Sequence, residues 1–254
     1  MKKHYWQLGI IALFILCLAG TVSATKPGFS QTNGQGTAVT VNGIVGAGEW
    51  EDSWRGKLYD GWTLTNNTYR VKWVGIGGTW YDEWLFEIFS DNTNDTGDFI
   101  QICYDSTLDG GAAPQTDDYL VNYTGHKTVN VYVGTGTGWA PTSDLDVIAA
   151  STISASPTNA TPHWIIEINV QNEWNDIGIR VAAYDASTGK TLMWPPYSAA
   201  NVPNDYGLSE LSYEPVPEGL TTGVMLLLST VAVIGGTRYF RKRPKTENFN
   251  QVKL

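Results

Sequence analysis

The stretch His163-Trp164-Ile165-Ile166-Glu167-Ile168-Asn169-Val170 decides the fold class of this 254-residue chain. From Trp164 onward, apolar residues occupy every second position, a period of two that is typical of a strand with one buried face. Five more segments have the character of strands: 69–73, 84–89, 99–104, 129–133 and 179–184. Gly, Asn, Asp and Pro clusters separate them, and the only helical candidate is a turn or two around 171–176. The pattern predicts an all-β protein, an antiparallel β-sandwich of the jelly-roll or immunoglobulin type.

Two apolar stretches flank this strand region. Lys2 and Lys3 precede an apolar run over 8–19 and the small residues 22–24, which predicts a signal peptide, with an uncleaved N-terminal anchor as the alternative. Residues 220–240 are long and apolar enough to cross a bilayer. Five cations between Arg238 and Lys245 place the following tail in the cytoplasm. The sequence therefore predicts a single-pass cell-surface protein with its N-terminus outside.

These signals divide the chain into six parts. They are a signal peptide (1–24), a flexible lead (25–36), a β-sandwich ectodomain (37–197), a last strand and stalk (198–219), one transmembrane helix (220–240) and a basic cytoplasmic tail (241–254). Between residues 25 and 214, 23 Asp and Glu stand against 8 Lys and Arg, a formal charge of −15. Such a surface repels nucleic acid and favours cations, although solubility alone also explains it. Cys103 is the only cysteine in this region, which excludes an internal disulfide and a thiolate metal site.

Four glycosylation sequons lie in the predicted ectodomain, and they begin at Asn66, Asn94, Asn122 and Asn159. The predicted topology permits their use, so we expect a glycoprotein with these residues in surface loops.

Several short motifs follow one another in a recognisable order: Val41-Asn42-Gly43-Ile44 with Glu49-Trp50, Val71–Val74, Asp82–Ile88 with Ser90-Asp91, Asp98–Ile102 with Asp105, His163–Ile168, Gly178–Ala182 and Trp194-Pro195. This series, over residues 41 to 196, resembles the family 9 carbohydrate-binding modules and the wider DOMON-like group, except that Asn42 replaces the usual Asp. The resemblance implies a β-sandwich that binds a sugar, often with structural calcium. Some relatives in the wider group bind haem instead.

The C-terminal region carries a second resemblance. Glu214-Pro215-Val216-Pro217-Glu218-Gly219, the apolar span and the cluster Arg241-Lys242-Arg243 are similar to the tripartite sorting signals of exosortase and archaeosortase substrates. Together with the sequons and the lack of disulfides, this tail indicates an archaeal host.

Ten tryptophans in the predicted ectodomain suggest an aromatic binding surface. Sugar rings stack on indole, while carboxylates and amides bind their hydroxyl groups. Trp80, Trp139 and Trp194 lie beside Gly or Pro in predicted loops, so we expect them to be the exposed stacking platforms. Packing in the core is the alternative for each of them.

Two acidic loops are candidate calcium sites. The first spans 91–98 and contains Asp91, Asp95 and Asp98, and the second spans 105–111 and contains Asp105 and Asp109. Calcium takes six to eight hard oxygens from a flexible loop, which such spacing can supply. Asx turns without a metal are the alternative.

Three hypotheses about the function remain open. The first is a surface-anchored, non-catalytic protein that binds carbohydrate or a cell-envelope glycan, braced by calcium. The second is a glycosylated structural protein of the cell envelope, associated with a surface layer. The third is a haem-binding electron-transfer domain with ligands among His126, His163 and Met193. The sequence contains no catalytic motif, and Gly134, Gly136 and Gly138 predict a hairpin, so we expect no enzyme.

Overall fold

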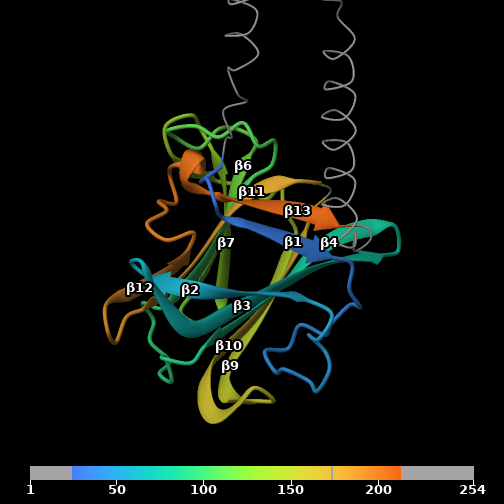
Figure 1. Ribbon diagram of the computed structural model, residues 1–254, viewed down its shortest axis with the longest axis vertical. Helices are drawn as coiled ribbons and strands as arrows, with labels where there is room; N and C mark the ends of the chain where they lie inside the picture. Colours follow the sequence, from blue (N-terminus) through green and yellow to red (C-terminus); the bar gives the residue numbers. More distant parts are fainter. Residues whose placement is uncertain (1–24, 173, 213–254) are drawn as a thin grey trace, which may run out of the picture. The chain divides into compact units, whose positions relative to one another are not determined.

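The computed structural model describes residues 25–172 and 174–212, and almost all of their regular structure is strand. The prediction of an all-β domain is therefore confirmed for these residues, with the 3₁₀ turn η1 (Pro203–Asp205) as the only helical element among them. Figure 1 shows the strands: β1 Ser30–Gly34, β2 Trp54–Asp60, β3 Thr63–Ile76, β4 Thr79–Ile88, β5 Phe99–Asp105, β6 Asp118–Thr124, β7 Thr128–Gly134, β8 Trp139–Pro141, β9 Val147–Ser156, β10 Asn159–Gln171, β11 Ile177–Asp185, β12 Lys190–Trp194 and β13 Gly207–Ser212.

The strands form one curled sheet. Its hydrogen-bonded order is β8-β7-β6-β5-β11-β12-β2-β3-β4-β10-β9, and β13 joins it beside β11 and carries β1 on its other side. Every strand pair is antiparallel except β1 with β13. The antiparallel prediction is thus confirmed for nearly the whole sheet.

Curling brings the two halves of the sheet face to face across one core, as in a sandwich. Trp84 of β4 donates from Nε1 to the hydroxyl of Tyr104 of β5 at 2.9 Å, although four strands separate β4 from β5 along the sheet. Tyr123 of β6 and Ser151 of β9 meet in the same way, with their oxygens 2.9 Å apart. The alternating apolar residues that predicted the strands supply this core, including the fully buried Trp164.

The segment between β1 and β2 covers the outer face of β3, β4 and β10. Glu167 holds it, because its carboxylate accepts hydrogen bonds from the backbone N–H groups of Asn42 and Gly43 at 2.9 Å and from Nε1 of Trp50 at 3.1 Å. Lys72 is fully buried beneath the segment, where its ammonium group lies 2.8 Å from Asp52 and 5.0 Å from the centre of the Trp50 ring. The polar positions of these strands therefore face protein, and only part of the sheet's outer surface is free.

The flexible lead predicted for 25–36 is wrong for residues 30–34, which form β1. This strand contains no apolar residue, so hydrophobic periodicity could not detect it. Polar contacts hold it instead: the buried Gln31 donates to Ser209 of β13 and accepts from the hydroxyl of Tyr69 at 3.0 Å. The helical turn predicted around 171–176 is likewise absent from residues 171, 172 and 174–176, because Gln171 and Asn172 continue the extended chain with hydrogen bonds to Asp146 and Trp80.

Several predicted segments lie outside the described residues. They are the signal peptide (1–24), the end of the stalk (213–219), the transmembrane helix (220–240) and the cytoplasmic tail (241–254). Within residues 25–172 and 174–212, no helix has the length and apolar character needed to cross a membrane.

Candidate functional site

A row of amide side chains crosses the outer face of β5, β6 and β7. Gln101 pairs in register with Asn122, and Asn122 pairs with Asn130, so the three side chains lie next to one another on one face. Their chain neighbours Ile100, Ile102, Val121 and Tyr123 point into the core on the opposite face. All three amides are half-buried, so they form a shallow polar strip open to solvent.

Hydrogen bonds orient part of this amide row. The oxygen of Gln101 accepts from Nη1 of Arg180 at 3.2 Å, and Nε of Arg180 donates to the carbonyl of Ser198 at 3.0 Å. The amide NH₂ of Gln101 therefore remains for another acceptor. Among the described residues, Oδ1 of Asn122 is buried and has no hydrogen-bond partner. An unsatisfied buried acceptor is costly, so Oδ1 of Asn122 would gain a hydrogen bond if the side chain turned toward a ligand or water.

Aromatic side chains stand at both ends of the amide row. Phe99 of β5 and Tyr184 of β11 form a register pair two residues from Gln101, and their rings stack with centres 5.0 Å apart and planes 18° apart. Tyr132 and Trp139 lie at the other end, packed against the small apolar cluster of Cys103, Leu120 and Tyr206. The row and these four rings together form what we call the amide face.

The structure separates the three tryptophans predicted to be stacking platforms. Trp139 is half-buried at one end of the amide face. Trp80 is 42% exposed and lines a pocket elsewhere in the domain. Trp194 is only 5% exposed, so the prediction that it is an exposed platform is wrong. It ends β12 rather than lying in a loop, and its ring packs in the core against Phe29, Trp54 and Tyr69.

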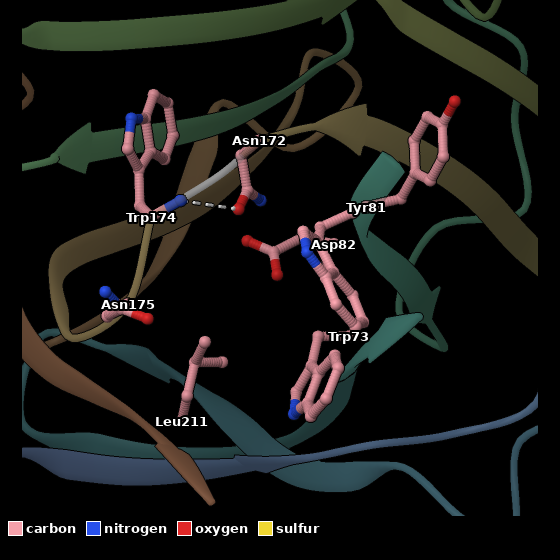
Figure 2. Close-up of a pocket in the computed structure, with 8 residues that line it drawn as sticks. Trp73, Tyr81, Asp82, Asn172, Trp174, Asn175 and Leu211 are labelled. Carbon is pink, nitrogen blue, oxygen red and sulfur yellow. Dashed lines mark hydrogen bonds between the residues drawn. The ribbon is translucent and has the colours of Figure 1, made fainter. Parts of the chain in front are cut away.

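Trp80 lines this pocket together with Trp73, Asp82 and Trp174 (Figure 2). Trp73 and Asp82 face each other in register on β3 and β4, and Trp174 closes the opposite side, where it stacks on Tyr119. The pocket is small, and it differs from the amide face in having a buried carboxyl group, that of Asp82.

An acidic cluster at the end of the β5–β6 pair fits a cation. Asp105, Asp117 and Asp118 each offer an oxygen within 4.8 Å of the others. One oxygen of Asp105 and one of Asp118 are buried with no hydrogen-bond partner among the described residues. Burial, and then the neighbouring negative charges, raise the pKa of Asp118 to about 7 and also raise that of Asp105. Buried carboxylates without a counter-charge suit a hard divalent cation such as calcium.

This cluster differs in part from the second predicted calcium loop. Asp105 belongs to it, but Asp109 is exposed and lies outside the three-residue group, where it accepts hydrogen bonds from Gln115. Asp118, the first residue of β6, and Asp117 just before it complete the cluster. The loop spacing could not identify them, because the pairing of Asp105 with Asp118 arises only when β5 and β6 form a hairpin.

The first predicted calcium loop also gathers carboxylates, but protein donors already satisfy most of them. Asp91, Asp95 and Asp98 meet His126 and Asp185, the last residue of β11, which was not predicted. Asp98 accepts from Nε2 of His126 at 2.7 Å and from the backbone of Ala186 at 2.8 Å. Hydrogen bonds from Ser187 and Thr188 lower the pKa of Asp185, against the effect of burial. This cluster therefore fits a cation less well than the one around Asp118.

The four predicted glycosylation sites occupy different environments. Asn94 is exposed in a loop, whereas Asn66 is exposed within β3, and Asn159 is half-buried at the start of β10. Asn122 lies in the middle of β6, so it is not in the surface loop that we expected. Its apparent motif spans a strand whose alternate residues are buried.

The three residues that the sequence offered as haem ligands make other contacts in the structure. His126 contacts Asp98, and buried His163 has Nδ1 2.8 Å from the carbonyl oxygen of Thr161 and Nε2 3.4 Å from Glu87. Met193 pairs in register with Ala182 and Tyr59 on another part of the sheet.

Comparison with known proteins supports the fold. No family model matches the sequence, and no curated protein matches it significantly. Two similar solved structures are of a family 9 carbohydrate-binding module from Caldicellulosiruptor kristjanssonii. The complex with cellotriose has a TM-score of 0.51 and 13% identity and covers 74% of this chain and 96% of that chain. The complex with glucose has a TM-score of 0.53 and 14% identity, and it covers 74% of this chain and 97% of that chain. At this identity the likeness shows a shared β-sandwich fold, as the sequence resemblance predicted.

Proposed function

We propose that this chain is a non-catalytic carbohydrate-binding protein whose amide face contacts the sugar. The observation that carries the proposal is the row of Gln101, Asn122 and Asn130 between two aromatic pairs. Amides present donors and acceptors together, as a sugar ring with neighbouring hydroxyl groups requires, and aromatic rings bind its apolar C–H faces. The similar fold of modules solved with cellotriose and glucose supports this choice of ligand class.

We further propose that calcium braces one end of the amide face. Asp105, Asp117 and Asp118 would hold the ion, with water completing its coordination. The ion would neutralise the repulsion between these carboxylates and fix the ends of β5 and β6, the strands that carry Gln101 and Asn122. Its role is structural, and it need not touch the sugar.

The sequence signals add a location to this function. The predicted signal peptide, span and basic tail support a protein anchored at the outer face of the cell membrane. There the amide face would bind a polysaccharide or an envelope glycan. The proposal requires Asn122 to be unmodified, because a glycan attached to it would cover the amide row.

The experiment is isothermal titration calorimetry of the full chain with glucose, cellotriose and a panel of other oligosaccharides in calcium. We expect saturable binding of one sugar class. Asn122→Ala and Gln101→Ala should each weaken it about tenfold, because each removes a hydrogen-bonding group from the face. Asn66→Ala is the matched control, since Asn66 is exposed on β3, outside the amide face. No binding by any sugar, or equal affinity in Asn122→Ala and the parent, would refute the proposal.

A further inference from the structure

The pocket of Figure 2 is built from residues far apart in the chain. Trp73 comes from the end of β3, Trp80 and Asp82 from the start of β4, and Trp174 from the segment after β10. Gly75 makes the arrangement possible, because a Cβ at this position would lie 2.5 Å from the Trp80 ring. The Trp73 and Trp80 rings pack edge to face with centres 4.9 Å apart. Three indole rings therefore line one small space.

A carboxyl group is directed into this space. Figure 2 shows the Asp82 side chain pointing between Trp174 and Leu211 on one side and Trp73 on the other. Asp82 is only 3% exposed, and among the described residues its Oδ2 has no hydrogen-bond partner. Burial raises the pKa of Asp82 to about 7, although the nearby amide of Asn172 lowers it. A buried carboxylate in this position is destabilising unless a positive charge compensates it.

The described residues around the pocket supply negative charge. None of the described residues that line the pocket is Lys, Arg or His. An adjoining groove shares Asn172 and Trp174 with the pocket, and it adds the exposed carboxylates of Asp144 and Asp146. The local potential therefore attracts cations and repels anions.

We propose that this pocket binds an organic cation, a quaternary or methylated ammonium group, held by the three tryptophans and Asp82. Indole faces attract cations, and a methylated ammonium group suits them because it has little need of hydrogen bonds. A metal ion fits less well, because Asp82 and the amides of Asn172 and Asn175 offer too few oxygens for calcium. This site is separate from the amide face, so cation binding can be tested independently of sugar binding.

The test is tryptophan fluorescence of the full chain titrated with choline and with 3,3-dimethylbutan-1-ol, a neutral molecule of nearly the same shape. We expect a saturable change with choline and at least about tenfold weaker binding of the neutral alcohol. Asp82→Asn should weaken choline binding at least about tenfold by removing the charge while keeping the shape. This variant should fold, because it removes an uncompensated buried charge.

Two further variants locate the binding. Trp80→Ala should also weaken choline binding, and it should leave the fold intact because Trp80 is 42% exposed. Trp62→Ala is the control, since Trp62 is 64% exposed and lies outside the pocket, and it should bind choline like the parent. A flat response to choline, equal binding of the neutral alcohol, or unchanged affinity in Asp82→Asn would overturn the proposal. Displacement of choline by glucose or cellotriose would also overturn it, because it would assign the pocket to sugar.

Discussion

The substitution Asp118→Asn should stabilise the calcium-free protein and should reduce the stabilisation that calcium provides. Asp118 is buried, and one of its oxygens has no hydrogen-bond partner among the described residues. Its pKa is 3.8 when unperturbed and about 7 in the folded protein. Without a bound cation, ionised Asp118 therefore disfavours folding by at most about 4 kcal/mol above pH 7. Asparagine keeps the shape and an acceptor oxygen for the Gln115 N–H, but it carries no charge.

The pH dependence of stability follows from the direction in which folding shifts the pKa of Asp118. Because folding raises the pKa, the folded protein binds more protons than the unfolded chain between about pH 4 and pH 7. In chelator, the stability of the parent should therefore fall as the pH rises through this range, and Asp118→Asn should lose much of that dependence. At pH 8 in chelator the variant should be more stable than the parent, and at pH 4 the two should be nearly equal.

Calcium should narrow this difference. An ion at one hundred times its dissociation constant would stabilise the parent by about 2.7 kcal/mol, and it would stabilise Asp118→Asn less, because a ligand is lost. The assay is urea unfolding followed by circular dichroism at pH 4 and pH 8, with calcium or with chelator. The reasoning is refuted if Asp118→Asn is the less stable protein in chelator at pH 8, or if calcium stabilises both proteins equally.

Two other substitutions test the packing. Glu167→Ala should lower the free energy of unfolding in urea by about 3 kcal/mol, because it leaves three N–H donors of the 42–50 segment without their acceptor. Glu51→Ala, on the surface, is the control and should cost little. A loss below about 1 kcal/mol in Glu167→Ala would mean that other contacts hold the segment. Trp194→Ala should cost about 3–5 kcal/mol, because Trp194 is a core residue, while Trp62→Ala should cost less than about 1 kcal/mol. Equal losses from the two tryptophans would contradict this assignment.

The sequence predicted those strands whose inner faces are apolar. Trp164 and its alternating neighbours are buried as expected, since period-two hydrophobicity reports one buried face. Hydrophobic periodicity did not predict β1, because polar side chains such as that of Gln31 fill its buried positions. β9 carries mainly small and polar residues at the edge of the sheet, so its pattern is weak. Local patterns also could not show that Lys72 is buried, because a distant segment covers it.

The candidate site was predictable only where its residues are neighbours in the chain. The loops around Asp91 and Asp105 were identified because their oxygens are close in sequence. Asp118 and Asp185 reach these loops from other strands, and strand register alone brings them there. The amide face is a product of register too, since Gln101, Asn122 and Asn130 lie on three strands. Trp194 was misplaced because its proline neighbour suggested a loop.

The pairing of β1 with β13 sets the order in which the domain can be completed during synthesis. Ser30 pairs with Leu208, so nearly the whole domain separates β1 from β13, its strand partner among the described residues. A chain made from its N-terminus must therefore hold β1 unpaired until residues 207–212 have emerged, because this long-range contact closes last. The strand Ser30-Gln31-Thr32-Asn33-Gly34 can stay unpaired during this time, because an exposed strand without apolar side chains has a low tendency to aggregate.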